Sequence, residues 1–442
     1  MTLLLIALGP CSIPLSSQSY HNSFTMPLLR KTTDMGWPQT DALWIYTLLP
    51  EPTLSDELQR LSFANSIGNT DVVSFQPCPN PEHANQDRFV IKDWPLANGT
   101  WTFRAIFDGH AGHETADYAA AQLPDAVKDH LTEALRHTQQ PVASAISDAL
   151  TKAISSFDKS IGDALVNIFP DQDALAKMSD EEIQRIINDD GPNSEAVVRC
   201  MRGTTVLVTL VDPSKSNMWV ASLGDCAASK VVSAGHKHDN NTVLVLGTKD
   251  ASGRWTSTVL SSAHNGENKV EADRVRSEHP GEQECVMDDR VLGAIAVTRA
   301  VGDFSFKLPA VYTNRVFLNS RPGFVIPEKV RSFIGRNLTP PYMSGTPDVE
   351  HIQLSGDSFL IMCTDGMMDL YEDDRLKLDA VLSKAWVRLV GENLDLAEGK
   401  NLALQLLRDG LGGTDEEKVS RMITVEMAFR WIDDTTIIVL RL

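Results

Sequence analysis

Aspartates recur at the ends of apolar runs whose composition suits buried strands. Asp108, Asp225 and Asp365 each follow such a run, and each stands next to a glycine. Asp87 and Asp433 come just before another apolar run. One aspartate at a strand end is an ordinary turn residue. Five in similar settings, three of them beside a glycine, indicate that these strand ends meet at one site.

Carboxylates gathered in this way suit metal chemistry. Like charges at one site raise each other's pKa unless something neutralises them, and a divalent cation does so directly. All-oxygen ligands without a cysteine or imidazole partner select Mg²⁺ or Mn²⁺ rather than zinc. Two such ions lower the pKa of a shared water and aim it at a phosphorus centre. The pattern therefore predicts metal-dependent hydrolysis of a phosphate ester.

Strand and helix patterns alternate from residue 71 onward. Apolar residues at 142–168 recur in steps of three and four, which places them on one helical face, and 113–137 has a similar helical pattern. The β-rich runs GTTVLVTLV and NMWVASLGD are separated by DPSKS and predict a hairpin. The acidic residues 171–195 predict a surface excursion, and the proline-rich residues 308–345 predict an irregular functional loop. One large α+β domain with two insertions accounts for the pattern.

The overall charge and the cysteine spacing exclude several classes of protein. A formal net charge of -19 argues against a nucleic-acid partner, because binding a polyphosphate requires a positive surface. A solvated acidic surface, a basic partner and a carboxylate cluster all remain open. The 6 cysteines contain no C-x-x-C pair, which opposes a zinc site or a disulfide scaffold and suits a reducing, intracellular compartment.

Residues 1–65 show no clean periodicity and predict a leader that packs partly on the domain, which spans 66–442. The longest apolar stretch, LLLIALG, is far too short to cross a bilayer, so no transmembrane segment is expected. Residues 1–33 have no acidic residue and only Arg30 and Lys31 as cations, a weak mitochondrial-presequence composition. A disordered leader on a cytoplasmic or nuclear protein is the alternative.

Six ordered motifs carry a family resemblance. FDGHAG, GTTVLVTLV, LGDC, LGAIAVTRAVGDFSFK, CTDGMMD and DDTTIIVL follow one another in the order and approximate spacing of the metal-dependent serine/threonine protein phosphatases of type 2C. The resemblance covers roughly residues 70–442. Within that family the segments EHP and TPPY resemble the pyruvate dehydrogenase phosphatase branch. Fungal-type relatives with other substrates are the alternative source of these two segments.

The resemblance implies a fold and a metal site. The fold would be a four-layer α-β-β-α sandwich of two antiparallel sheets flanked by helices, with Mg²⁺ or Mn²⁺ in a cleft at one end. Two ions and a weaker third would be held. The implied contacts are a bridge from Asp108, the backbone carbonyl of Gly109, the carboxylates of Asp365 and Asp433, a water-mediated contact from Asp87 and the third-ion ligand Asp225.

The resemblance also assigns the proton donor. His110 would protonate the departing seryl or threonyl oxygen, since an alkoxide is a poor leaving group at neutral pH. The alternative is a histidine that only hydrogen-bonds a site carboxylate. Arg299 and Asp303, in TRAVGD, would support the site from beneath. His264 is expected to be structural.

Several positions depart from the family pattern. Gln86 stands where many relatives have glutamate, Cys226-Ala227 replaces a more usual Ser-Arg pair, and Ala263 replaces an aspartate. The upstream arginine that often binds substrate phosphate is missing, because NPEHANQDR has Glu82 and His83 there. Arg88 is a weak substitute.

None of these changes removes a primary ligand, so an active enzyme on a phosphoprotein is expected, with a pyruvate dehydrogenase complex as one partner. The alternatives are a pseudophosphatase that binds phosphoproteins without hydrolysing them, and a cytosolic signalling phosphatase.

Overall fold

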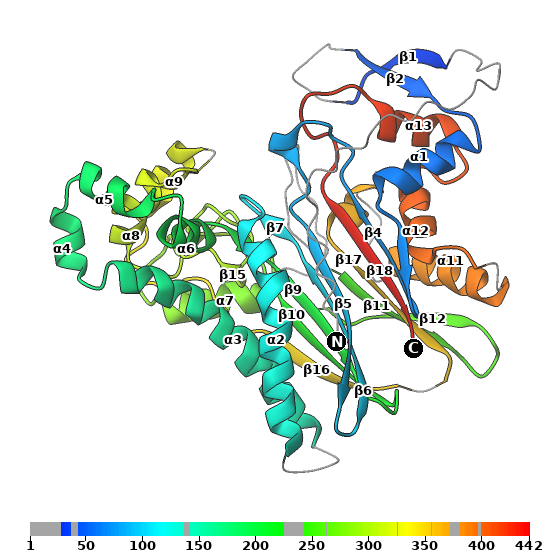
Figure 1. Ribbon diagram of the computed structural model, residues 1–442, viewed down its shortest axis with the longest axis horizontal. Helices are drawn as coiled ribbons and strands as arrows, with labels where there is room; N and C mark the ends of the chain where they lie inside the picture. The colour runs from blue at the N-terminus through cyan, green and yellow to red at the C-terminus, as the bar shows by residue number, and fades with distance from the viewer. Residues whose placement is uncertain are drawn as a thin grey trace, which may run out of the picture.

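The computed structural model describes residues 28–36, 43–136, 142–224, 243–261, 263–324, 326–354, 356–371, 381–396 and 399–442. Two antiparallel sheets face each other at its centre (Figure 1). One has the strand order β16 (Asp348–Gln353), β10 (Asn217–Leu223), β9 (Val206–Val211), β6 (Gly99–Phe107) and β5 (Arg88–Leu96). The other has the order β12 (Trp255–Val259), β11 (Val243–Lys249), β17 (Ser358–Cys363), β18 (Thr435–Arg441), β4 (Thr70–Phe75) and β3 (Asn65–Ile67).

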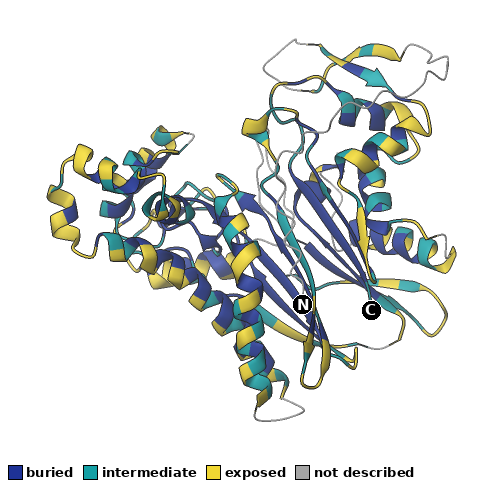
Figure 2. Ribbon diagram, in the orientation of Figure 1, coloured by how far each residue is buried: buried dark blue, intermediate teal, exposed yellow. Residues whose placement is uncertain are grey.

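The central strands are apolar on both faces because both faces are covered. In β9, Val206, Val208 and Leu210 point to the helical layer, while Leu207 and Val211 point between the sheets. In antiparallel sheets a continuous apolar run of this kind indicates that helices cover the outer face. Figure 2 shows the central strands buried and the outer sides of the helices exposed.

The helices complete the four layers that the sequence predicts. Helices α2 (Glu114–Arg136) and α3 (Ala143–Ile168) cover the five-stranded sheet. Helices α11 (Ser383–Leu396) and α12 (Leu402–Leu411) cover the six-stranded sheet. The predicted stripe of α3 is confirmed from Ile146 to Leu165, which lie in one core cluster.

The two insertions pack against each other. Residues 171–195 form α4 (Gln172–Lys177), α5 (Asp180–Ile187) and the start of α6 (Pro192–Met201). Residues 308–345, for which the prolines predict an irregular loop, contain α8 (Ala310–Arg315) and α9 (Pro327–Ile334) as well as irregular backbone. Pro327 stands in the first turn of α9, where the missing N–H has no partner to lose. A proline-rich segment can therefore still contain helices.

Part of the predicted leader is built into the fold. Strands β1 (Leu29–Thr33) and β2 (Trp44–Leu48) form an antiparallel pair that lies on α13 (Glu416–Thr424), and α1 (Thr53–Leu61) follows. Residues 1–27 lie outside the described residues. Within the described part of the chain, no helix is long and apolar enough to cross a membrane.

A buried ion pair connects α3 to the TRAVGD segment. The Nζ of Lys307 lies 2.8 Å from both carboxylate oxygens of Asp158, and both side chains are less than a tenth exposed. Asp158 also accepts the backbone N–H of Gly302 at 2.9 Å. Burial holds the pKa of Asp158 above its ordinary value although Lys307 acts against it.

Breaking this pair is expected to destabilise the fold strongly. Lys307→Met leaves a carboxylate buried without its cation, so the free energy of unfolding should fall by about 3–5 kcal/mol in urea titrations. Lys159→Met is the matched control, because Lys159 pairs with Asp163 on the exposed side of the same helix. That loss should stay below about 1 kcal/mol. Similar losses in the two variants would contradict the assignment.

Candidate active site

Four of the predicted aspartates come together from both sheets. Asp87 and Asp108 flank strands of the five-stranded sheet, while Asp365 and Asp433 flank strands of the six-stranded sheet. Asp87, Asp108 and Asp365 are at most 5% exposed. The carboxylates of Asp108, Asp433 and Asp87 all act electrostatically on Asp365. These four residues therefore lie near one another, and their role as metal ligands stays a prediction.

Their pKa values show how strongly the site disfavours negative charge. Burial, followed by Asp108 and Asp433, raises the pKa of Asp365 well above its ordinary value. Burial, followed by Asp434, does the same to the pKa of Asp87. Nearby carboxylates shift pKa values upward in this way when positive charge is insufficient. A cation bound here would favour their ionised forms.

The oxygen donors fit a hard divalent cation. Asp87 accepts a hydrogen bond from the Thr364 hydroxyl at 2.8 Å through one oxygen, while its other oxygen is buried without a hydrogen-bond partner among the described residues. Orphaned buried acceptors of this kind suit Mg²⁺ or Mn²⁺, which take carboxylate and carbonyl oxygens. Within the described ranges no three acidic, histidine or cysteine side chains already form a group that could hold a metal. The carboxylates thus interact electrostatically, but among the described residues they are not arranged as a complete set of metal ligands.

Three short strands hold His110 against an aspartate. Strand β8 (Gly203–Thr204) lies between β7 (Gly109–His110) and β15 (Val301–Gly302). This brings His110 Nε2 within 2.6 Å of Asp303 Oδ2. A Cβ on Gly203 would lie about 2 Å from both groups, so only glycine fits between them. Asp303 has φ +54°, and its N–H donates to the Arg202 carbonyl at 2.8 Å.

Two site residues escaped the sequence argument. Asp434 is 3% exposed and accepts bonds from the Gln86 N–H at 2.8 Å and the Gln76 side chain at 2.9 Å. Arg430 lies 3.0 Å from Asp434 and 3.5 Å from Asp433. The one available signal was the order of residues in RWIDD, which places a cation three and four positions before the aspartates.

Arg88, the predicted substitute for the missing phosphate-binding arginine, is bonded to other groups of the protein. Its Nε contacts Asp117, and its Nη1 donates to the backbone carbonyls of Asn85 at 2.9 Å and Asp87 at 2.7 Å. These bonds fix the backbone beside Asp87. The described contacts therefore give Arg88 a structural role at the edge of the site.

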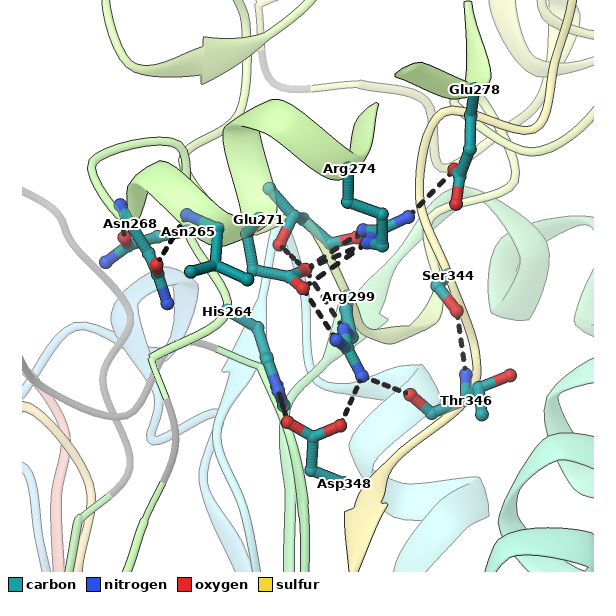
Figure 3. Close-up of polar contacts among 12 residues, drawn as sticks. His264, Asn265, Asn268, Glu271, Arg274, Glu278, Arg299, Ser344, Thr346 and Asp348 are labelled. Carbon is teal, nitrogen blue, oxygen red and sulfur yellow. Dashed lines mark hydrogen bonds and ion pairs between the residues drawn. The ribbon is translucent and has the colours of Figure 1, made fainter. Parts of the chain in front are cut away.

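Asp225 lies outside the described residues, but the glycine before it is anchored. The Gly224 N–H donates to His264 Nδ1 at 3.2 Å, and the His264 N–H donates to the Gly224 carbonyl at 3.1 Å. His264 Nε2 lies 2.9 Å from Asp348, which accepts from Arg299 at 2.8 Å (Figure 3). These contacts fit the structural role predicted for His264.

Glu271 is the buried end of this network. It accepts from Arg299 at 2.6 Å and Arg274 at 3.0 Å (Figure 3), and the Thr298 hydroxyl donates to it at 2.7 Å. Burial alone would raise the pKa of Glu271, but the hydrogen bonds from the two arginines and the threonine outweigh it and hold the pKa below its ordinary value. The ionised carboxylate is therefore the form that the fold stabilises.

The segments EHP and TPPY meet in the structure. His279 from the first stacks on Tyr342 from the second, with ring centroids 4.0 Å apart. The Tyr342 hydroxyl donates to Glu282 at 2.5 Å, and His279 contacts the Pro341 carbonyl at 3.1 Å. His279 and Tyr342 are buried. The pair therefore closes a core cluster and presents no recognition surface of its own.

Glu271→Gln is expected to lower stability in a pH-dependent way. A depressed carboxyl pKa gives stability that is present above the unfolded value, about 4.3, and is lost as the pH falls toward the folded value. Urea titrations at pH 7 and pH 5 should show the variant about 3 kcal/mol less stable than the wild type, with a smaller gap near pH 3.5. Glu278→Gln is the control, because exposed Glu278 pairs with the same Arg274 and should change stability little. A gap that is constant with pH would contradict this role.

Comparison with known proteins identifies the family. The Protein phosphatase 2C family matches residues 73–378. A protein phosphatase 2C homolog of Schizosaccharomyces pombe is 27% identical, covering 84% of this chain and 78% of the relative. The mitochondrial [pyruvate dehydrogenase [acetyl-transferring]]-phosphatase 1 is 25% identical in Saccharomyces cerevisiae, covering 76% of this chain, and 28% identical in Homo sapiens, covering 65%.

The chain spans only 61% and 56% of the length of these two mitochondrial relatives. A solved serine-threonine phosphatase 2C from Toxoplasma gondii has 15% identity and a TM-score of 0.47, covering 86% of this chain and 96% of the other. The family match spans well over half of the sequence. The chain therefore belongs to the protein phosphatase 2C family, an Mg²⁺- or Mn²⁺-dependent class of protein serine/threonine phosphatases.

Proposed function

We propose that the chain hydrolyses phosphoserine and phosphothreonine in proteins by direct attack of a metal-activated water, without a phosphoenzyme. The observation that carries this proposal is the burial of carboxylates from distant chain segments around Asp365. Such a set of hard oxygen donors suits two Mg²⁺ or Mn²⁺ ions. Bound there, the ions would supply the activated water and neutralise charge on the phosphate.

The protein's own groups would divide the work among them. Asp108, Asp365 and Asp433 would hold the two ions with the Gly109 carbonyl, Asp87 would act through a water, and Asp225 would hold a weaker third ion. Gly109 has room for no side chain, because a Cβ would lie 2.4 Å from the Gln86 carbonyl oxygen. This close packing keeps the Gly109 backbone beside the Asp87 segment.

His110 would protonate the leaving oxygen of the substrate. Its Nε2 is bonded to Asp303, whereas its Nδ1 is buried without a hydrogen-bond partner among the described residues. Nδ1 is therefore the nitrogen left for proton transfer, and Asp303 sets the orientation of the ring. A correctly placed acid matters most when the leaving group is a poor one such as a seryl alkoxide.

The substrate proposal is a phosphorylated pyruvate dehydrogenase in mitochondria. Two mitochondrial pyruvate dehydrogenase phosphatases among the relatives support it, together with the composition of residues 1–33. The buried EHP–TPPY contact adds no support, because it presents no surface to a substrate. A purified, phosphorylated pyruvate dehydrogenase compared with an unrelated phosphoprotein tests the substrate class directly.

Turnover is expected to require a divalent cation. Phosphoserine-peptide hydrolysis should appear with Mn²⁺, stop in excess chelator and return when Mn²⁺ is restored. Asp108→Asn should abolish it, because the variant loses a charged ligand, whereas Asp163→Asn on the exposed face of α3 should retain it. Full activity in excess chelator would contradict the mechanism. Tight binding of two ions by calorimetry without turnover on any phosphopeptide would instead identify a phosphoprotein-binding module.

His110→Ala should slow the reaction according to the leaving group. For a phosphoserine peptide the expected loss in kcat is roughly 10²–10⁴-fold, the usual range for general acid catalysis. For 4-nitrophenyl phosphate, whose leaving group needs little protonation, the loss should be far smaller. Asp303→Asn should show the same selectivity more weakly, because it disturbs only the orientation of the ring. Equal losses on both substrates would rule out the acid role.

A further inference from the structure

A cation from the C-terminal part of the chain covers the segment where the family's upstream arginine is missing. In place of that arginine the sequence has Glu82 and His83. The guanidinium of Arg430 donates from Nη2 to the Ala84 carbonyl at 2.7 Å and from Nε to the His83 carbonyl at 3.4 Å. The side chain thus comes from a position remote in sequence but lies on the same stretch of backbone.

Arg430 also reaches the carboxylates of the site. Its Nη2 lies 3.0 Å from Asp434, and its Nη1 lies 3.5 Å from Asp433. The side chain remains 22% exposed, so solvent reaches part of it. A positive group at this position therefore borders a proposed metal ligand, Asp433, and keeps part of its surface open to solvent.

Other arginines around the site bond to groups other than the carboxylates of Asp433 and Asp434. Arg88 is held by Asp117 and by backbone carbonyls. Arg202 is 5% exposed and donates to the Gly323 carbonyl at 2.9 Å. Arg299 is bonded to Glu271 and Asp348. Arg430 differs from these three in contacting the cluster carboxylates while keeping exposed surface.

The backbone around Arg430 is fixed on both sides. The Glu426 N–H donates to the Ile45 carbonyl at 2.8 Å, and Phe429 packs edge-on against Trp44 with ring centroids 5.4 Å apart. On the other side, the Trp431 indole N–H donates to the Met422 carbonyl at 2.9 Å. A side chain on a braced segment loses little further conformational entropy when it binds a ligand.

We propose that Arg430 binds the substrate's phosphate, in place of the missing upstream arginine. The proposal rests on the proposed phosphatase function. Among the guanidinium nitrogens, Nη1 makes the longest bond, a single one of 3.5 Å to Asp433, so its hydrogens are the most available to a phosphate oxygen. A guanidinium suits phosphate because it stays charged and donates charge-assisted hydrogen bonds.

Phosphate affinity in the full-length, Mn²⁺-loaded protein tests the proposal. Arg430→Gln should raise the Kd for inorganic phosphate, measured by calorimetry, roughly 10-fold or more, as expected for loss of a charge-assisted hydrogen bond. The KM for a phosphopeptide should rise in parallel. The affinity for Mn²⁺ should be no weaker than in the wild type, because a competing cation has been removed from Asp433.

Arg408→Gln is the matched control. Arg408 is similarly exposed at 20%, and it bonds to Glu51, Ser55 and the Gly413 carbonyl, none of which belongs to a proposed metal ligand. It should leave phosphate affinity unchanged. Arg430→Lys keeps the charge but loses the guanidinium N–H groups, so it should give an intermediate Kd, and it also covers the case in which Arg430→Gln does not fold.

Two results would overturn the proposal. One is an unchanged phosphate Kd in the Arg430 variants with altered Mn²⁺ affinity, which would mean that Arg430 only balances the charge of Asp433 and Asp434. The other is an equal rise in Kd in Arg408→Gln. Failure of the proposed function is distinguishable, because the wild type itself would then show no Mn²⁺-dependent hydrolysis of the phosphopeptide.

Discussion

Mutual repulsion among buried carboxylates is the constraint that the rest of this structure has to satisfy. Bringing Asp87, Asp108 and Asp365 out of water is costly, and the raised pKa values of Asp87 and Asp365 show that the surrounding protein groups do not neutralise these two carboxylates. The apolar core between the sheets supplies the opposing free energy, because side chains from strands of both sheets interlock there and hold the strand ends in place. The free energy gained from the apolar core therefore offsets the cost of burying the carboxylates at the strand ends.

Polar contacts around the carboxylates reduce that cost locally. Asp434 has the Gln86 N–H, the Gln76 amide and the Arg430 guanidinium as donors, so it is compensated without a metal. Burial raises its pKa nonetheless, with Arg430 acting in the opposite direction. Asp87 has an unmatched oxygen instead. Asp434 therefore supports the structure of the site, whereas Asp87 keeps an oxygen available to a ligand.

The N-terminal pair β1–β2 extends this support beyond the segment matched by the family. It contacts the loop before Arg430 through the Ile45 carbonyl and the Trp44 ring, and Lys31 contacts Glu417 at 2.7 Å. Residues that the sequence presented as a leader thus position a loop next to the proposed metal ligands. Such a contact cannot be predicted from local sequence, because the residue pattern of neither segment indicates that it packs against the other.

The difference between local sequence patterns and contacts between distant segments explains which features could be predicted. The α3 stripe and the buried strands follow from periodicity, which is a local property, and the aspartates at strand ends follow from counting such strands. The Asp303–His110 bond, the Arg430 contacts and the helices within 308–345 depend on how distant segments pack, so the residue pattern could not specify them. The expectation of an irregular segment at 308–345 missed these helices because prolines were treated only as breakers, whereas one of them begins a helix.

The contact between EHP and TPPY shows why a branch signature is weak evidence for a substrate. His279 and Tyr342 are buried against each other, so changing either one alone would leave a cavity or an unpaired polar group. Such a pair persists wherever the surrounding core persists, whatever the enzyme acts on. Substrate choice has to come from exposed groups that meet the protein substrate beyond its phosphate, and neither His279 nor Tyr342 is such a group.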